Sequence, residues 1–141
     1  MPLLNYTTTI SAQKTVGEIQ GILAGHGAMA ILMNYVDGEV ESLSFKVMTV
    51  HGEVAIRLPV DPDAVLLVMQ RGRVPRAYCN WAQAVRVAWR ILKSWVQAQM
   101  ALIETDMVKM EQVFLPYWVV PSGKTLYDHI VDTKFQLPGG D

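Results

Sequence analysis

Apolar residues recur at helical spacing near the N-terminus and again in the second half of the sequence, with alternating stretches between them. The first helical pattern has its apolar face formed by Val16, Ile19, Ile22 and Leu23. Thr15 and Glu18 fit a capping box that begins this helix, and Gly25 or Gly27 can end it in the left-handed conformation. Residues 3–10 precede the helix and are rich in threonine, which predicts a short edge strand.

Three alternating stretches follow, at residues 28–36, 39–50 and 53–60, and they predict an antiparallel meander. Asp37-Gly38 between the first two is a strong signal for a type I′ turn. Val40 and Leu43 differ in parity, which predicts either a bulge near Ser42 or a sheet that is apolar on both faces. A two-residue loop at His51-Gly52 would place Val47 opposite Ile56, Phe45 opposite Leu58 and Lys46 opposite Arg57.

The second half of the chain predicts a short buried helix and then a long one. Asp61-Pro62 starts the short helix and Gly72 ends it. The long helix is expected from near Tyr78 to Met107. One stripe of it is apolar and consists of Trp81, Val85, Ala88, Leu92, Trp95, Leu102 and Ile103. The opposite stripe is polar and consists of Arg86, Arg90, Lys93 and Gln97, with Trp89 at its flank.

These elements predict a single α+β domain over residues 1–141. It has an N-terminal helix, a three-stranded antiparallel meander that a short N-terminal edge strand could extend, and a long C-terminal helix packed on the sheet. The tail returns to aromatic character at residues 113–120 and ends in a short helical segment at 124–131.

Composition adds an expectation about partners. The chain has 141 residues, 51% of them hydrophobic and 18% charged, but its apolar runs are shorter than the ~20 residues of a membrane span. We therefore expect the surplus apolar surface to lie between subunits of a homo-oligomer. The aromatic residues expected there are Trp81, Trp95, Phe114, Tyr117 and Trp118. The single cysteine and the absence of a visible secretory signal predict a cytoplasmic protein.

The charges are segregated although the net charge is only −1. Residues 64–103 contain no Asp or Glu, so the cations there have no acidic neighbour at helical spacing. This predicts an anion site, with Trp89 and Tyr78 available to stack, Trp89 as the first candidate, and with Lys46 and Arg57 as a second cationic pair. The alternative interpretation is a solvated surface, or a basic face that pairs with Glu39, Glu41 and Glu53 elsewhere in the fold. The cations of the acid-free segment are Arg71, Arg73, Arg76, Arg86, Arg90 and Lys93.

No catalytic, metal-binding or cofactor-binding signature is present. The histidines lack partners at ligand spacing, and Cys79 lacks a placed base and is expected to be a buried small residue. Residues 121–125 read Pro-Ser-Gly-Lys-Thr, but Trp118 stands where a phosphate-binding loop needs its first glycine. A turn that caps the last helix is the better interpretation. We therefore expect a protein that binds without catalysis and needs no cofactor or metal.

Several segments resemble a group of small proteins encoded by bacteriophages and prophages. They are Lys14-Thr-Val-Gly-Glu-Ile-Gln-Gly-Ile-Leu-Ala24, His51-Gly-Glu, Arg86-Val-Ala-Trp-Arg90, Lys93-Ser-Trp-Val-Gln-Ala-Gln99, Phe114-Leu-Pro-Tyr117 and Gly123-Lys-Thr-Leu-Tyr127. None of them is a catalytic motif, and the resemblance implies a viral context only. The order of one helix, three strands and a helix also resembles the topology of double-stranded-RNA-binding domains.

Together these observations favour a nucleic-acid-binding accessory protein of phage replication or recombination, with a single-stranded ligand. Two alternatives use the same residues. The first is a viral counter-defence protein that sequesters a nucleotide signal or blocks a host defence protein. The second is a structural homo-oligomer in which the basic face of one subunit meets an acidic face of the next.

Overall fold

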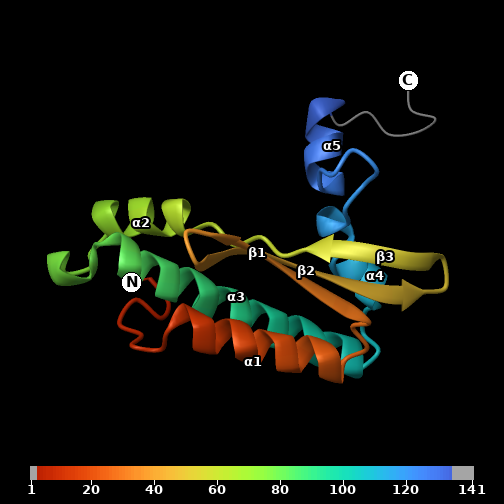
Figure 1. The fold of residues 1–141 in the computed structure, drawn as a ribbon, viewed down its shortest axis with the longest axis horizontal. Coiled ribbons are helices and arrows are strands. Elements are labelled where there is room, and N and C mark those ends of the chain that lie inside the picture. Colours follow the sequence, from red (N-terminus) through yellow and green to blue (C-terminus); the bar gives the residue numbers. More distant parts are fainter. Residues whose placement is uncertain (1–2, 135–141) are drawn as a thin grey trace.

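The computed structural model describes residues 3–134 and confirms the α+β class (Figure 1). Helix α1 (Ala12–Gly25) precedes a sheet of order β1-β2-β3, formed by β1 (Ala30–Val36), β2 (Glu39–Thr49) and β3 (Gly52–Arg57). Helix α2 (Pro62–Arg71), the 3₁₀ turn η1 (Arg76–Tyr78) and the long helix α3 (Trp81–Glu104) follow. The tail contains α4 (Met110–Val113), η2 (Leu115–Tyr117) and α5 (Leu126–Asp132). None of the helices described could cross a membrane.

The hairpin of β1 and β2 forms as expected. Asp37 and Gly38 have φ values of 51° and 80°, as a type I′ turn requires. The register shifts between Asn34 and Tyr35, which pair with Ser42 and Val40, so the extra residue on β2 is Glu41. The bulge predicted near Ser42 is therefore confirmed.

The register predicted for β2 and β3 is wrong. Thr49 pairs with Gly52, so the loop is Val50-His51 and every pair is displaced by two residues. Phe45 lies opposite Ile56, and Lys46 lies opposite Ala55 instead of Arg57. The Thr49 hydroxyl donates to the Gly52 carbonyl at 2.9 Å and accepts from the His51 amide at 3.0 Å. These local hydrogen bonds close the hairpin one residue earlier than the sequence signal suggests.

The core lies between one face of the sheet and the two helices α1 and α3, which run side by side along that face (Figure 1). Its centre contains Leu43, Phe45 and Ile56 from the sheet, Ile19 and Leu23 from α1, and Trp89 and Val96 from α3. A second cluster lies between α2 and α3. Helix α3 is therefore buried on two of its sides, because it packs on α2 as well as on the sheet and α1.

This double burial corrects the stripe predicted for α3. Ala88 and Leu92 are buried as expected, but Trp81 is 46% exposed and Trp89 only 1%. Trp89 belongs to the core cluster with Val96 and leaves no ring face for a ligand. The predicted N-terminus also differs, because Asn80 caps α3 by accepting from the Gln83 amide at 2.9 Å.

The N-terminal segment also departs from the prediction. Residues 3–10 form turns and irregular backbone with no strand, and Tyr6 packs edge-on against Tyr78 at 5.5 Å between ring centres. Helix α1 begins one turn earlier than the predicted capping box, because Ser11 accepts from the Lys14 amide at 3.1 Å. Thr15 is then a fully buried residue inside the helix.

The aromatic tail folds back on its own chain. Phe114 is fully buried and lies 5.6 Å from the rings of both Phe45 and Trp95. The Val119 amide donates to the Ala55 carbonyl at 2.8 Å, and Trp118 bridges Ile56, so this segment covers the outer edge of β3. Of the five aromatic residues expected between subunits, only Trp81 is more than a third exposed.

Candidate functional site

The turn between α2 and α3 carries the most accessible cations of the acid-free segment. Gly72 caps α2, since its amide donates to the Val68 carbonyl at 2.9 Å and a Cβ at this position would meet the same oxygen at 2.9 Å. Val74 then turns inward and is buried against Met69, so the polar residues on either side of it face solvent. We call Arg71, Arg73 and Arg76 the arginine turn.

The arginine turn is not neutralised within residues 3–134. All three side chains are exposed, and no ion pair to any of them occurs in this part of the chain. The half-buried ring of Tyr78 lies at the end of the turn, held by its contact with Tyr6. Three guanidinium groups within six residues form a site suited to phosphate oxygens, which guanidinium donors bind in bidentate fashion.

Arg86 is positioned by a buried glutamine that the sequence analysis did not single out. The Gln83 oxygen accepts from Nε and Nη2 of Arg86 at 3.0 and 2.7 Å. The Gln83 amide nitrogen donates to the carbonyls of Tyr6 and Thr8 at 2.8 and 3.0 Å. Gln83 thus ties the N-terminal segment to α3, and it does not offset the positive charge of Arg86 because its side chain is neutral.

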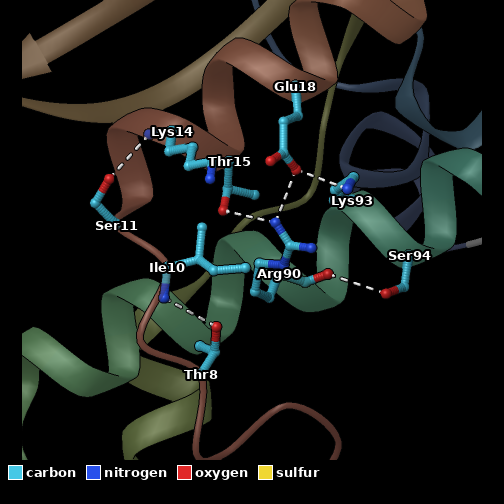
Figure 2. A network of polar contacts seen from close by, with 9 residues as sticks. All are labelled: Thr8, Ile10, Ser11, Lys14, Thr15, Glu18, Arg90, Lys93 and Ser94. Atoms are coloured by element: carbon cyan, nitrogen blue, oxygen red, sulfur yellow. Dashed lines mark hydrogen bonds and ion pairs between the residues drawn. The ribbon is translucent and has the colours of Figure 1, made fainter.

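Arg90 and Lys93 have no acidic neighbour within their own helix, but both are paired with Glu18 of α1, which is not one of the acidic residues considered as partners in the sequence. Glu18 of α1 accepts from Arg90 Nη1 at 2.8 Å and from Lys93 Nζ at 2.6 Å, as Figure 2 shows. Arg90 also reaches the Thr15 hydroxyl at 3.4 Å. These contacts link α1 to α3 on their polar side. The sequence could not show them, because Glu18 lies 72 residues from Arg90.

The two neighbouring cations favour the ionised form of Glu18. The hydrogen bond from Lys93 is the largest influence and holds the pKa of Glu18 below its usual value, with Arg90 acting in the same direction and partial burial opposing both. One carboxylate between two cations leaves a net positive charge there. However, Arg90 and Lys93 both bind the Glu18 carboxylate. The two cations therefore link α1 to α3 and are not an open anion site.

The second cationic pair predicted from the sheet register does not form. Lys46 lies 3.3 Å from Glu53 on the same face of the sheet. Arg57 lies opposite Ser44 and lines a groove instead. Lys46 and Arg57 therefore do not face each other across the strands. No repulsion between these two cations needs to be relieved by a bound anion.

The groove that Arg57 lines is acidic. It has a volume of about 950 Å³ and lies among the β1–β2 hairpin, the segment leading into α2, the start of α3 and the tail. Trp81, Tyr117 and Tyr127 contribute aromatic surface. Arg57 is the one cation among the described residues that line it. The carboxylates are those of Asp37, Glu39, Glu41, Asp61, Asp63 and Asp128.

The remaining reactive side chains have structural partners. Cys79 is half-buried, and its thiol donates to the Met69 carbonyl at 3.3 Å. His26 donates from Nδ1 to the Ile22 carbonyl at 2.7 Å and contacts Glu104 through Nε2 at 2.6 Å. Thr125 caps α5, as expected for the Pro-Ser-Gly-Lys-Thr segment. Within residues 3–134, no group of three or more His, Cys, Asp or Glu residues could hold a metal ion.

The comparisons give no relative from which a function could be transferred. No protein-family model, curated protein or solved structure matches this chain. The viral context suggested by the quoted segments therefore stays a prediction.

Proposed function

We propose that this protein binds nucleic acid through the arginine turn, with Arg86 as a fourth contact, and does so without catalysing a reaction. The observation that supports the proposal is the group of three exposed guanidiniums with no acidic partner in the described chain. The rest of the predicted cationic set contributes less, because Arg90, Lys93 and Lys46 are engaged with carboxylates. An accessory role in phage replication or recombination is a prediction that rests on the resemblance alone.

The expected ligand interaction is with the phosphate backbone. Two aromatic residues favour a single-stranded ligand in the sequence; Trp89 is buried in the core and cannot stack on a base, and Tyr78 is half-buried at the end of the arginine turn. Phosphate contacts by arginines are independent of base sequence, so we expect single-stranded and duplex DNA to bind with similar affinity. The acidic groove disfavours the alternative of a sequestered nucleotide, because its six carboxylates would repel phosphate from it.

The salt dependence of binding tests the proposal. With four cations engaged, affinity for a labelled 30-mer should fall with a log–log slope of about −3, which is roughly a 60-fold loss between 50 and 200 mM salt. Fluorescence anisotropy measures this directly.

A matched pair of triple variants identifies the surface that is responsible. Changing Arg71, Arg73 and Arg76 together to Gln should abolish most of the binding at 50 mM salt. Changing Lys14, Lys109 and Lys134 to Gln removes the same net charge from exposed positions elsewhere and should leave most of it. Equal losses in the two variants, or no binding by the unaltered protein at low salt, would refute the proposal.

A further inference from the structure

The sheet has one covered edge and one open edge. On β3, the Val119 amide donates to Ala55 and Trp118 bridges Ile56, so the tail occupies the outer edge of this strand. On the other side of the sheet, β1 pairs with β2 alone, and no other strand or bridge reaches its outer edge within residues 3–134 (Figure 1). A strand in this position presents unpaired backbone donors and acceptors, and their natural complement is another strand.

The sequence of β1 does nothing to prevent such pairing. Its seven residues, Ala-Ile-Leu-Met-Asn-Tyr-Val, include no charged residue and no proline. Leu32 is 62% exposed and Tyr35 58%, so large apolar side chains accompany the open edge. Edge strands that stay single are usually protected by lysine, proline or a covering segment. The β3 edge has such a cover, and the β1 edge has none in the described chain.

A groove beside β1 offers room for the side chains of an added strand. It has a volume of about 500 Å³, and it lies between α1, the start of α3 and the β1–β2 hairpin. Met33 and Tyr35 of β1 line it, together with Val16 of α1 and Val40 of β2. Addition of a strand to a sheet edge combines backbone hydrogen bonds with pockets for alternate side chains, and both features are present here.

We propose that β1 of one copy pairs antiparallel with β1 of a second copy, forming a six-stranded sheet across a two-fold axis. The occupant is a second copy because the strand is uncharged and apolar, and so is complementary to itself. The assembly stops at two copies because the β3 edge of each is already covered. The pairing does not involve Arg71, Arg73 or Arg76, so it does not depend on whether the arginine turn binds nucleic acid. Arg86 lines the groove beside β1 and is shared by the two proposals.

Lysine substitutions at two equally exposed positions distinguish the loss of this pairing from the general effect of adding a charge to the protein surface. Leu32 and Met48 are each 62% exposed and point to the same open face of the sheet, but Leu32 is on the edge strand and Met48 on the central one. In a two-fold dimer, Leu32→Lys enters both copies and places two like charges near the axis. We therefore expect the dimer dissociation constant to rise by at least about tenfold. Met48→Lys should leave the constant unchanged.

Sedimentation equilibrium of the full chain across a wide range of concentration measures both constants. Amide hydrogen exchange adds a local readout, since the outer amides of β1 should be protected in the unaltered protein and should exchange faster in Leu32→Lys. Ala30→Lys, also exposed on β1, replaces Leu32→Lys if circular dichroism shows that the latter is unfolded. A monomer at every concentration, or equal dissociation of the Leu32→Lys and Met48→Lys variants, would overturn the inference.

Discussion

Replacing Gln83 by Met should destabilise the protein although the two side chains are similar in length and shape. Gln83 is 4% exposed and uses both ends of its amide, with two donated hydrogen bonds to the N-terminal segment and two accepted from Arg86. Methionine fills similar space and makes none of these bonds. The carbonyls of Tyr6 and Thr8 and the guanidinium of Arg86 then lose their partner.

The magnitude follows from the bonds that are lost. A neutral hydrogen bond contributes about 0.5–1.5 kcal/mol to the free energy of unfolding, and one to a charged group about 1.5–3 kcal/mol. Tyr6, Thr8 and Arg86 are only half-buried, so water can replace part of what is lost. We therefore expect a loss of about 2–3 kcal/mol, which moves the urea midpoint down by about 1–2 M for a domain of this size.

Equilibrium urea unfolding monitored by tryptophan fluorescence measures this loss, with Trp89 as a buried reporter. The matched control is Gln97→Met, which makes the same change at an exposed position on α3 and should alter the free energy of unfolding by less than about 0.5 kcal/mol. Limited proteolysis should also cleave the first ten residues faster in the Gln83 variant. Indistinguishable midpoints for the two variants would refute the role assigned to Gln83.

Two further predictions concern the pH dependence of stability. The pKa of His26 is raised, first by its hydrogen bond to the Ile22 carbonyl and second by Glu104. Because the folded state favours the protonated ring, this contribution is complete below the ordinary pKa near 6.5 and is lost as the pH rises through the raised value. His26→Ala should therefore lower the thermal midpoint more at pH 5.5 than at pH 8, and equal shifts at the two pH values would argue against it. Glu18 has a lowered pKa, so the stability it contributes is present at neutral pH and is lost as the pH falls through that value. Glu18→Gln should be less stable than the unaltered protein at pH 7, and the difference should shrink in an acid titration; a constant difference down to the lowest pH would contradict the pairing with Lys93.

Local signals in the sequence predicted local structure well. Asp37-Gly38 forms the expected turn, and Asp61 caps α2 by accepting from the Ala64 amide at 3.2 Å. These features depend on residues within four positions of each other, where backbone preference and side-chain capping decide the outcome. The bulge at Glu41 was also foreseeable, since a change of parity in an apolar strand needs an extra residue.

Features that depend on tertiary contacts could not be predicted in this way. A helical wheel places Trp89 beside the basic stripe, but α3 is covered on two sides and the ring lies in the core. The partner of Arg90 and Lys93 is in another helix, and the acidic groove collects residues from segments far apart in the chain. The arginine turn is the part of the predicted site that stays accessible, because glycine and proline keep it outside the packed helices.

The two ends of α2 carry opposite charges, and the distance between them affects how strongly the protein attracts a polyanion at a given salt concentration. Asp61 and Asp63 lie at its start and Arg71 at its end, about 15 Å apart for a helix of ten residues. At physiological ionic strength the Debye length is about 8 Å, so a phosphate beside Arg71 is screened from the distant carboxylates. At 0.01 M it is about 30 Å, and the molecule then acts as a dipole whose two ends largely cancel at a distance. Lowering the salt should therefore strengthen polyanion binding only down to the point where the screening length reaches the length of α2, and below that point the gain should flatten.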